Sequence, residues 1–430
     1  MSMATPIGEE MYRWAGDLFP ICRSITGHGV RQTLRYFQKI LPELTICEVP
    51  SGTPAFDWTV PDEWNIRDAY VMDDQGVKVI DFNQNNVHVV GYSTPVDSVM
   101  TLEELEPYLH SLPHLPEAIP YLTSYYRPRW GFCLSHRARQ ELKPGRYRVV
   151  IDSTLAPGSL TYGELILPGR EEREILLSTY TCHPSLANDN LSGPLVTTAL
   201  AQELAARSDR RYTYRIVYIP ETIGSLVYLS RHLDRMKRTT LAGFVLTCVG
   251  DDRSYSFLPS RMGNTLADRV AGHVLKHRAP GYATYSFLDR GSDERQYCSV
   301  GIDLPVVSLM RTMYGVFPEY HTSLDNLSLI SPSGLGGAYQ AILSCLDLLE
   351  ENYTYRMTCP GEPQLGKRGL YPTLSTRENS AIVRNLSNVM AYADGDHDLI
   401  ALAERTEVFA EELLPVVKSL FSAGLLEKVD

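Results

Sequence analysis

EILLSTYTCHPSLANDNLSG, residues 174–193, is the stretch that decides the fold of this chain. It opens with an apolar run of strand length, passes through a turn-rich loop, and leads into an apolar segment with helical spacing. The same order recurs after residue 214, where YRIVYIP precedes a second helical stretch. Strands that alternate with helices predict an α/β fold, a mostly parallel sheet flanked by helices.

This alternation extends over residues 147–355, which we assign to one domain together with two predicted helices in residues 1–44. The predicted strands are YRVVID, YGELILP, EILLSTY, YRIVYIP, LAGFVLTCV and LPVVSLM. Between 45 and 146, short alternating runs such as VKVIDF and NVHVVGY predict an inserted β-rich domain. After the linker TCPGEPQLGKRG, the spacing of two short helices in residues 365–430 resembles a winged-helix domain.

The composition indicates a globular protein with a net charge of -11 and 44% hydrophobic residues over 430 positions. We find neither a secretory leader nor an apolar run long enough to cross a membrane, so we expect a cytoplasmic protein. The eight cysteines form no C-x-x-C pair and are expected to be reduced. The acidic C-terminal domain favours contact with another protein or with a second copy of the chain over contact with nucleic acid.

Polar clusters follow four of the predicted strands, at the edge where ligands of such sheets bind. They comprise His183 with Asp189, then Glu221, then Asp289, Asp293 and Glu294, and finally His321 with Asp325. Each cluster taken alone has an ordinary explanation, because such residues also cap helices and fill surface loops. Their occurrence at one edge of one sheet favours a functional site.

Two imidazoles and one carboxylate are the usual ligands of a catalytic zinc, which keeps one position open for water. We therefore predict that His183, Asp189 and His321 bind zinc and that Glu221 is the general base. Asp325, four residues after His321, is the predicted hydrogen-bond partner that fixes the tautomer of that imidazole.

The order HPSLANDNLSG, PETIG, SDERQYCSVGIDLP and YHTSLDN, within about 170–350, resembles the zinc aminopeptidase clan that also contains glutaminyl cyclases. The resemblance implies that the first His binds a metal and that the Asp of D-N-x-S-G bridges two zincs. It also implies that a pair of Glu residues supplies the base and one ligand, that a later Asp is a further ligand, and that the His of Y-H-T completes the site.

More closely, the chain resembles a bacterial family with an aminopeptidase-like domain. The segments that carry this resemblance are PICRSITGHGVRQTL, VPDEWNIRDAYV and SYYRPRWGFCLSHRAR, and the similarity extends over nearly all 430 residues. It implies a β-rich domain inserted after the first helices and a winged helix at the C-terminus.

Two departures from the clan's pattern bear on the number of metals. Thr222 stands where the second Glu of the pair is expected, and Thr247 stands where the later Asp ligand is expected. One ligand is thus missing from each metal position, and we predict a single zinc. Asp293 and Glu294 occupy positions that line the pocket in the clan, so they are predicted to bind the free amino group of a substrate unless they only cap the next helix. Tyr314 is predicted to contact a substrate carboxylate or oxyanion.

These features predict a zinc-dependent aminopeptidase-like hydrolase that cleaves an amide bond of a peptide or an aminoacylated small molecule. A binding or scaffold protein built on an inactive peptidase fold is the alternative, and the two missing ligands favour it. A DNA-binding regulator is a third hypothesis. The sequence lacks H-E-x-x-H, a phosphate-binding P-loop and Gly-x-Ser-x-Gly, so it does not indicate other common hydrolase classes.

Overall fold

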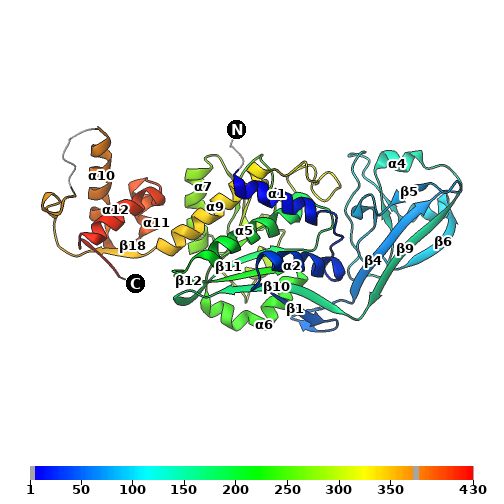
Figure 1. The fold of residues 1–430 in the computed structure, drawn as a ribbon, viewed down its shortest axis with the longest axis horizontal. Helices are drawn as coiled ribbons and strands as arrows, with labels where there is room; N and C mark the ends of the chain where they lie inside the picture. Colours follow the sequence, from blue (N-terminus) through cyan, green and yellow to red (C-terminus); the bar gives the residue numbers. More distant parts are fainter. Residues whose placement is uncertain (1–4, 371–376, 430) are drawn as a thin grey trace. The chain divides into compact units, whose positions relative to one another are not determined.

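The computed structural model describes residues 5–370 and 377–429. The chain divides into two compact units, which are coloured by sequence in Figure 1. The first unit comprises Met1–Ala267 and Ala283–Gln340, and the second comprises Asp268–Tyr282 and Ala341–Asp430.

An eight-stranded sheet in the order β1-β10-β12-β11-β13-β16-β14-β15 forms the centre of the first unit. The strands are β1 (Thr45–Pro50), β10 (Ser159–Leu167), β11 (Glu171–Tyr180), β12 (Tyr212–Ile219), β13 (Thr240–Val245), β14 (Ser256–Leu258), β15 (Ala283–Thr284) and β16 (Val306–Met310). Strands β12, β11, β13 and β16 run parallel, whereas β10 and β14 join them antiparallel. The predicted α/β fold is confirmed, with antiparallel pairing toward both edges.

Helices cover both faces of this sheet. Helices α1 (Pro6–Leu18) and α2 (His28–Ile40) contact α5 (Ser192–Ala206), which packs on β11, and α6 (Ile223–Thr239) lies on the opposite face (Figure 1). Because both faces are covered, Glu174–Tyr180 of β11 is buried at every position, as expected for an apolar strand inside a parallel sheet. Helix α8 (Glu294–Tyr297) also belongs to this unit, whereas most residues of α7 (Leu266–Arg278) and the second half of α9 (Pro332–Glu351) belong to the second unit.

A second, antiparallel sheet has the order β5-β4-β9-β6. Its strands are β4 (Glu63–Met72), β5 (Lys78–Asp81), β6 (Val96–Thr101) and β9 (Arg146–Ala156). The same part of the chain contains β2 (Pro54–Ala55), β3 (Trp58–Thr59), α3 (Leu102–Leu105), β7 (Leu109–His110), β8 (Phe132–Cys133) and α4 (His136–Glu141).

The sheets do not follow the boundaries that we predicted for the insertion at residues 45 and 146. Strand β1 pairs with β10 of the large sheet, and β9, whose YRVVID we assigned to the parallel sheet, pairs with β4 and β6 instead. In β9, buried Tyr147, Val149 and Ile151 alternate with more accessible residues. This period of two fits an antiparallel strand with one buried face better than a strand covered on both faces.

The second unit carries a three-stranded antiparallel sheet of β17 (Thr354–Met357), β18 (Asp394–Asp398) and β19 (Leu426–Lys428). Helices α10 (Arg377–Tyr392), α11 (Leu399–Thr406) and α12 (Ala410–Ser422) accompany it. Asp398 caps α11 by accepting a hydrogen bond from the Ala401 amide, and the same carboxylate pairs with Arg269. The first strand, β17, lies before residue 365, where we expected this region to begin.

The described residues include no helix that combines the length and the apolar character needed to cross a membrane. All eight cysteines are free thiols, in agreement with the sequence-based expectation.

Gly193 fixes the contact of α5 with the large sheet. A Cβ atom there would lie 2.2 Å from the Leu246 carbonyl oxygen and 2.6 Å from the Thr179 hydroxyl oxygen. We expect Gly193→Ala to lower the free energy of unfolding by about 1–3 kcal/mol, because the helix must move away from the sheet. Gly16→Ala, in α1 with nothing within 4 Å of the added Cβ, is the control and should be neutral or stabilising. Thermal unfolding midpoints of both variants test this, and equal midpoints would contradict it.

Candidate active site

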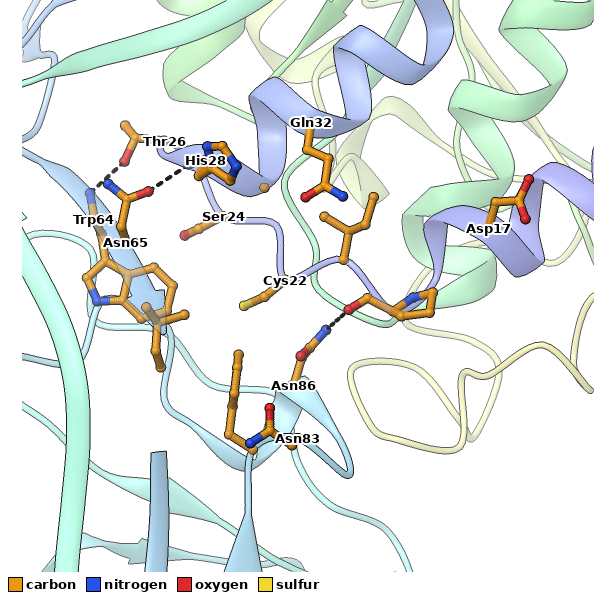
Figure 2. A pocket seen from close by; sticks show the side chains of 15 residues that line it. Asp17, Cys22, Ser24, Thr26, His28, Gln32, Trp64, Asn65, Asn83 and Asn86 are labelled. Atoms are coloured by element: carbon orange, nitrogen blue, oxygen red, sulfur yellow. Dashed lines mark hydrogen bonds between the residues drawn. The ribbon is translucent and has the colours of Figure 1, made fainter. Parts of the chain in front are cut away.

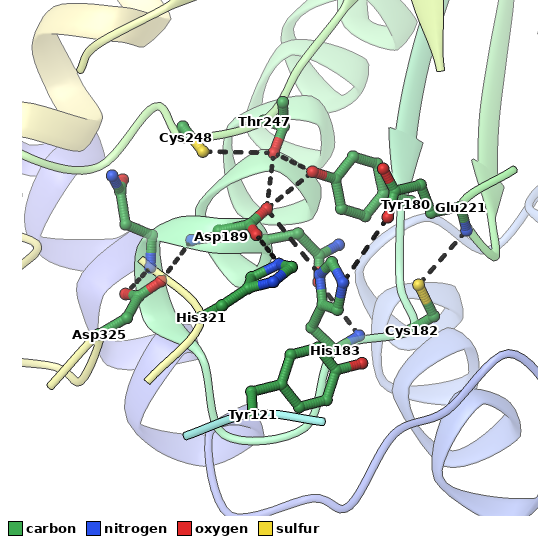
Figure 3. Close-up of polar contacts among 12 residues, drawn as sticks. Tyr121, Tyr180, Cys182, His183, Asp189, Glu221, Thr247, Cys248, His321 and Asp325 are labelled. Carbon is green, nitrogen blue, oxygen red and sulfur yellow. Dashed lines mark hydrogen bonds and ion pairs between the residues drawn. The ribbon is translucent and has the colours of Figure 1, made fainter. Parts of the chain in front are cut away.

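Loops at the carboxyl ends of the parallel strands bring the predicted residues together (Figure 3). His183 and Asp189 follow β11, Glu221 follows β12, and His321 lies beyond β16. The ligand atoms of His183, Asp189 and His321 all lie within 4.8 Å of one another. Cys182, His183 and Glu221 form a second such group, so His183 connects the base to the other two side chains.

The distances within this group suit a small cation. His321 Nε2 lies 3.0 Å from Asp189 Oδ2, and His183 Nδ1 lies 3.8 Å from Asp189 Oδ1. Apart from these contacts within the group, His183 Nδ1, Asp189 Oδ2 and His321 Nε2 have no hydrogen-bond partner among the described residues, although all three atoms are buried. Buried polar atoms without partners are rare in native proteins. Two nitrogens and one carboxylate oxygen that share this property fit a metal ion, and zinc in particular.

The other carboxylate oxygen of Asp189, Oδ1, already accepts hydrogen bonds. It accepts a hydrogen bond of 2.7 Å from the Tyr180 hydroxyl and a longer one of 3.4 Å from Thr247 Oγ1. Thr247 is the residue found where the resemblance implies an Asp ligand. Its hydroxyl supports Asp189 in this structure, which leaves Oδ2 as the free oxygen of that carboxylate.

Thr222, at the other substituted position, also makes hydrogen bonds through both its amide and its hydroxyl. Its amide donates to Asp293 Oδ1 at 2.8 Å, and its hydroxyl oxygen accepts a hydrogen bond of 2.6 Å from Arg295 Nη2. A cationic guanidinium therefore lies against the position at which the resemblance implies a carboxylate ligand. This neighbourhood disfavours a second metal ion, because like charges repel.

Asp325 does not have the role that we predicted for it. Instead of bonding the His321 imidazole, its Oδ1 accepts hydrogen bonds from the amides of Ala187 and Asn188, and its Oδ2 accepts one of 2.8 Å from the Asp189 amide. Burial raises the pKa of Asp325 to about 7, although these three donors act in the opposite direction. The carboxylate thus fixes the loop that carries Asp189.

Burial sets the protonation of the site. It lowers the pKa of His183 to about 4, so the imidazole is neutral at neutral pH. Burial alone would raise the pKa of Asp189, but the nearby His183 and His321 and the Tyr180 hydroxyl outweigh it and lower that pKa to about 2. Neutral imidazole and ionised carboxylate are the forms that bind metals.

Glu221 has the opposite shift. Burial, followed by the negative charges of Asp293 and Asp189, raises its pKa well above the usual value. Glu221 Oε2 lies 3.6 Å from His183 Nε2. A carboxylate with a raised pKa next to a metal site has the proton affinity that general base catalysis requires.

A segment between β7 and β8 covers the two imidazoles. The ring of Tyr121 meets those of His183 and His321 edge to face, with centroid distances of 5.2 Å in both cases. The Tyr121 amide donates to the His321 carbonyl oxygen, and Ile119 and Ser323 exchange two hydrogen bonds. The orientation of both imidazoles therefore depends on residues from the β-rich part of the chain.

Strained backbone conformations occur around the site. Ser185, Thr222, Cys248 and His321 have positive φ angles of 45°, 63°, 50° and 53°, which non-glycine residues rarely adopt. Each costs on the order of 1–3 kcal/mol and persists only where surrounding contacts enforce it. Such a concentration at the ends of parallel strands is typical of functional sites.

The predicted substrate-binding residues do not reach the cavity. Asp293 and Glu294 are fully buried, and Tyr314 is 8% exposed. Asp293 Oδ1 accepts hydrogen bonds from Thr222 and Ser225, and burial raises its pKa to about 6. Glu294 accepts hydrogen bonds from the Gly291 and Ser292 amides and from the Tyr314 hydroxyl. These groups support the wall of the site instead of facing a ligand.

The cavity above the site has a volume of about 340 Å³. The cavity is lined by His183, Glu221 and His321, by four aromatic residues and by the cation Arg295. The aromatic residues are Trp58, Tyr121, Tyr125 and Tyr126, and the remaining lining residues are Ile25, Thr123, Cys182, Thr222 and Ile223. Sequence reasoning missed Tyr121 and Arg295. Tyr121 carries no local signal, whereas Arg295 directly follows the acidic pair that we did select.

Arg23 is another residue to which we assigned no role from the sequence. It is 1% exposed, and its Nε and Nη1 donate to the carbonyl oxygens of His183 and Leu18. Burial lowers its pKa to about 10, which leaves it charged at neutral pH. Arg23 thus ties the loop of His183 to the end of α1.

Another cavity of the first unit, of about 440 Å³, lies beside α2 (Figure 2). Its polar lining consists mainly of amides and hydroxyls, including Ser24, Gln32, Asn83 and Asn86. Cys22 also lines it, but burial raises the pKa of that thiol to about 12, so it is not a nucleophile at neutral pH. Of the candidate metal ligands among the described residues, His183 and His321 line the other cavity.

The Asp325 carboxylate gives a test of how the metal-binding loop is held. Asp325→Asn replaces one acceptor oxygen by an NH₂ group that faces backbone N–H groups, so we expect a loss of about 1–3 kcal/mol of stability. Asp303→Asn is the matched control, because Asp303 is 37% exposed and pairs with Arg261 at the surface; its loss should stay below about 1 kcal/mol. Thermal unfolding compares the two, and equal losses would show that the three amides do not depend on Asp325.

Comparisons with known proteins agree with this architecture. Residues 12–352 match the family model described as a domain of unknown function, DUF4910, and residues 353–428 match a winged helix-turn-helix model. The winged-helix prediction for the C-terminal region is thereby confirmed. A protein of Clostridium acetobutylicum, provisionally named a polysaccharide biosynthesis protein with an aminopeptidase-like domain, is 46% identical over 98% of this chain and 97% of its own length.

Solved structures give the same result. A crystal structure from Clostridium acetobutylicum, described provisionally as a peptidase, has a TM-score of 0.93 at 45% identity and covers 98% of this chain and 96% of that one. The zinc aminopeptidase of Bacillus subtilis has a TM-score of 0.57 at 10% identity, with 81% of this chain and 96% of that chain covered. At that identity the likeness concerns the fold.

Proposed function

The chain belongs to the DUF4910 family, and from this membership and the geometry of the site we propose that it is a zinc-dependent hydrolase of the aminopeptidase type. Its substrate is a peptide or an aminoacylated small molecule that contains an amide bond. The observation that carries the proposal is that three buried atoms of His183, Asp189 and His321 lie together, next to Glu221, and have no hydrogen-bond partner outside their own group among the described residues.

We assign one zinc to His183, Asp189 and His321. Zinc bound there supplies a Lewis acid that lowers the pKa of water toward neutrality. A single ion is supported by the hydrogen bonds that occupy Asp189 Oδ1 and by the Thr222 and Arg295 contact at the other position.

Glu221 is the general base in this proposal. Burial and the neighbouring acids raise its pKa, so it takes up a proton from water more readily than a surface carboxylate does. Protonated Glu221 then donates to the leaving nitrogen. Tyr180 and Thr247 hold Asp189 in position, and Tyr121 does the same for both imidazoles.

A binding protein with an inactive peptidase fold is the second candidate, and the replacement of two ligands by Thr222 and Thr247 favours it. The raised proton affinity of Glu221 favours the enzyme, because a metal that only stabilises the fold needs no base.

The name of the Clostridium relative adds polysaccharide biosynthesis as a pathway, so acylated amino sugars belong to the proposed substrate class. We also propose a cytoplasmic location and a homo-oligomer contact through the winged-helix region.

The metal content tests the ligand set. The purified chain should carry about one zinc, measured by inductively coupled plasma mass spectrometry. His183→Ala removes one of the three ligands and should abolish stoichiometric zinc. His88→Ala is the control, because that ring bonds the Cys133 carbonyl oxygen elsewhere in the chain and should leave zinc unchanged. Two zincs in the unmodified chain, or full zinc in the His183 variant, would contradict the assignment.

The base is tested by turnover. Glu221→Gln keeps the shape of the side chain but cannot accept the proton, so hydrolysis in a screen of aminoacyl amides should fall at least about 100-fold while zinc stays bound. Glu203→Gln on α5, a residue that pairs with Arg207, should keep full activity. Undiminished turnover by the Glu221 variant would remove the proposed base. Zinc without turnover in the unmodified chain would favour the binding protein.

A further inference from the structure

Arg295 is a cation that lines the cavity next to Glu221. It is half-buried, and no carboxylate of the described residues lies within ion-pair distance of its guanidinium. The two acids that precede it are directed elsewhere, because Asp293 bonds Thr222 and Ser225, and Glu294 bonds backbone amides and Tyr314. The charge of Arg295 acts on Glu221 and Asp293 and lowers the pKa of both, but among the described residues no ion pair neutralises it, which leaves it open to a group of a ligand.

The guanidinium is fixed in place without being neutralised. Asp293 holds the amide of Thr222, and the Thr222 hydroxyl accepts a single hydrogen bond from Arg295 Nη2. A guanidinium has five N–H donors, and within the described residues this bond is the one that Arg295 makes. Its Nε is buried and has no partner. A Glu at position 222, as the resemblance implies for the clan, would pair with Arg295 and cancel this charge.

We infer that Arg295 binds a carboxylate of the substrate, so that the amide cleaved beside Glu221 belongs to an acidic compound. This inference rests on the proposed function and specifies its substrate. The planar guanidinium fork matches a carboxylate with two parallel hydrogen bonds. A phosphate dianion fits less well, because Glu221 and Asp189 lie nearby and one cation does not balance two further negative charges.

Part of the cavity wall is aromatic. Trp58 and Tyr126 are 40% and 52% exposed, and their rings meet edge to face with centroids 5.6 Å apart. Exposed aromatic side chains in a cavity offer a face on which an apolar or ring-shaped part of a ligand packs. The cavity therefore suits a small molecule that carries both a carboxylate and a ring.

Ligand binding to the full-length, metal-stripped chain tests this inference independently of catalysis. N-benzoylglycine and its neutral analogue N-benzoylglycinamide differ only in the carboxylate, and calorimetric titration gives the dissociation constant of each. We expect N-benzoylglycine to bind about tenfold to a hundredfold more tightly, as charge-assisted hydrogen bonds typically provide. Equal affinities, or tighter binding of phenyl phosphate than of N-benzoylglycine, would overturn the inference.

Variants test whether Arg295 causes the preference for the ligand with a carboxylate. Arg295→Gln should bring the ratio of the two dissociation constants close to one, and Arg295→Lys should leave an intermediate ratio because the charge remains but the fork is lost. Arg290→Gln is the matched control, since Arg290 is exposed and does not line the cavity. Trp58→Ala should weaken both ligands to the same degree. An unchanged ratio in Arg295→Gln would overturn the inference. If Arg295→Gln does not fold, the ratio of the two dissociation constants in Arg295→Lys and in the unmodified chain tests the inference instead.

Discussion

The carboxylate of Asp325 is the contact on which the site depends. It accepts hydrogen bonds from three consecutive backbone amides, at Ala187, Asn188 and Asp189, and so joins the loop beyond β16 to the loop beyond β11. The two loops are 136 residues apart in the chain, yet they carry His321 and Asp189, which must share one ion in the proposed site.

The ionisable groups buried in the site have pKa values that are shifted in different directions. His183 is driven to its neutral form and Asp189 to its ionised form, whereas Glu221 is driven toward protonation. The difference between the two acids lies in their partners, because Tyr180 donates to Asp189, and Glu221 faces other carboxylates. Two arginines, the buried Arg23 and the half-buried Arg295, lie around this group, and the guanidinium of each donates to neutral oxygen acceptors.

Sequence patterns predicted the large sheet and the convergence of His183, Asp189, Glu221 and His321, because strand ends in parallel sheets share an edge. They assigned β9 to the wrong sheet, since a short apolar run does not reveal whether one face or both are covered. The inward direction of Asp293 and Glu294 could not be predicted, because it depends on Thr222 and Tyr314, which are distant in sequence. The role of Tyr121 depends on a loop pairing that leaves no local pattern.

The segment around Tyr121 also limits which molecules can reach the site. It lies over the imidazoles and is hydrogen-bonded to the loop of His321, and the cavity beside it has a volume of about 340 Å³. That volume accommodates a molecule of drug size, whereas a folded polypeptide cannot present an internal peptide bond inside it. If the proposed hydrolase activity is correct, the size of the cavity restricts it to small molecules and to the ends of flexible peptides.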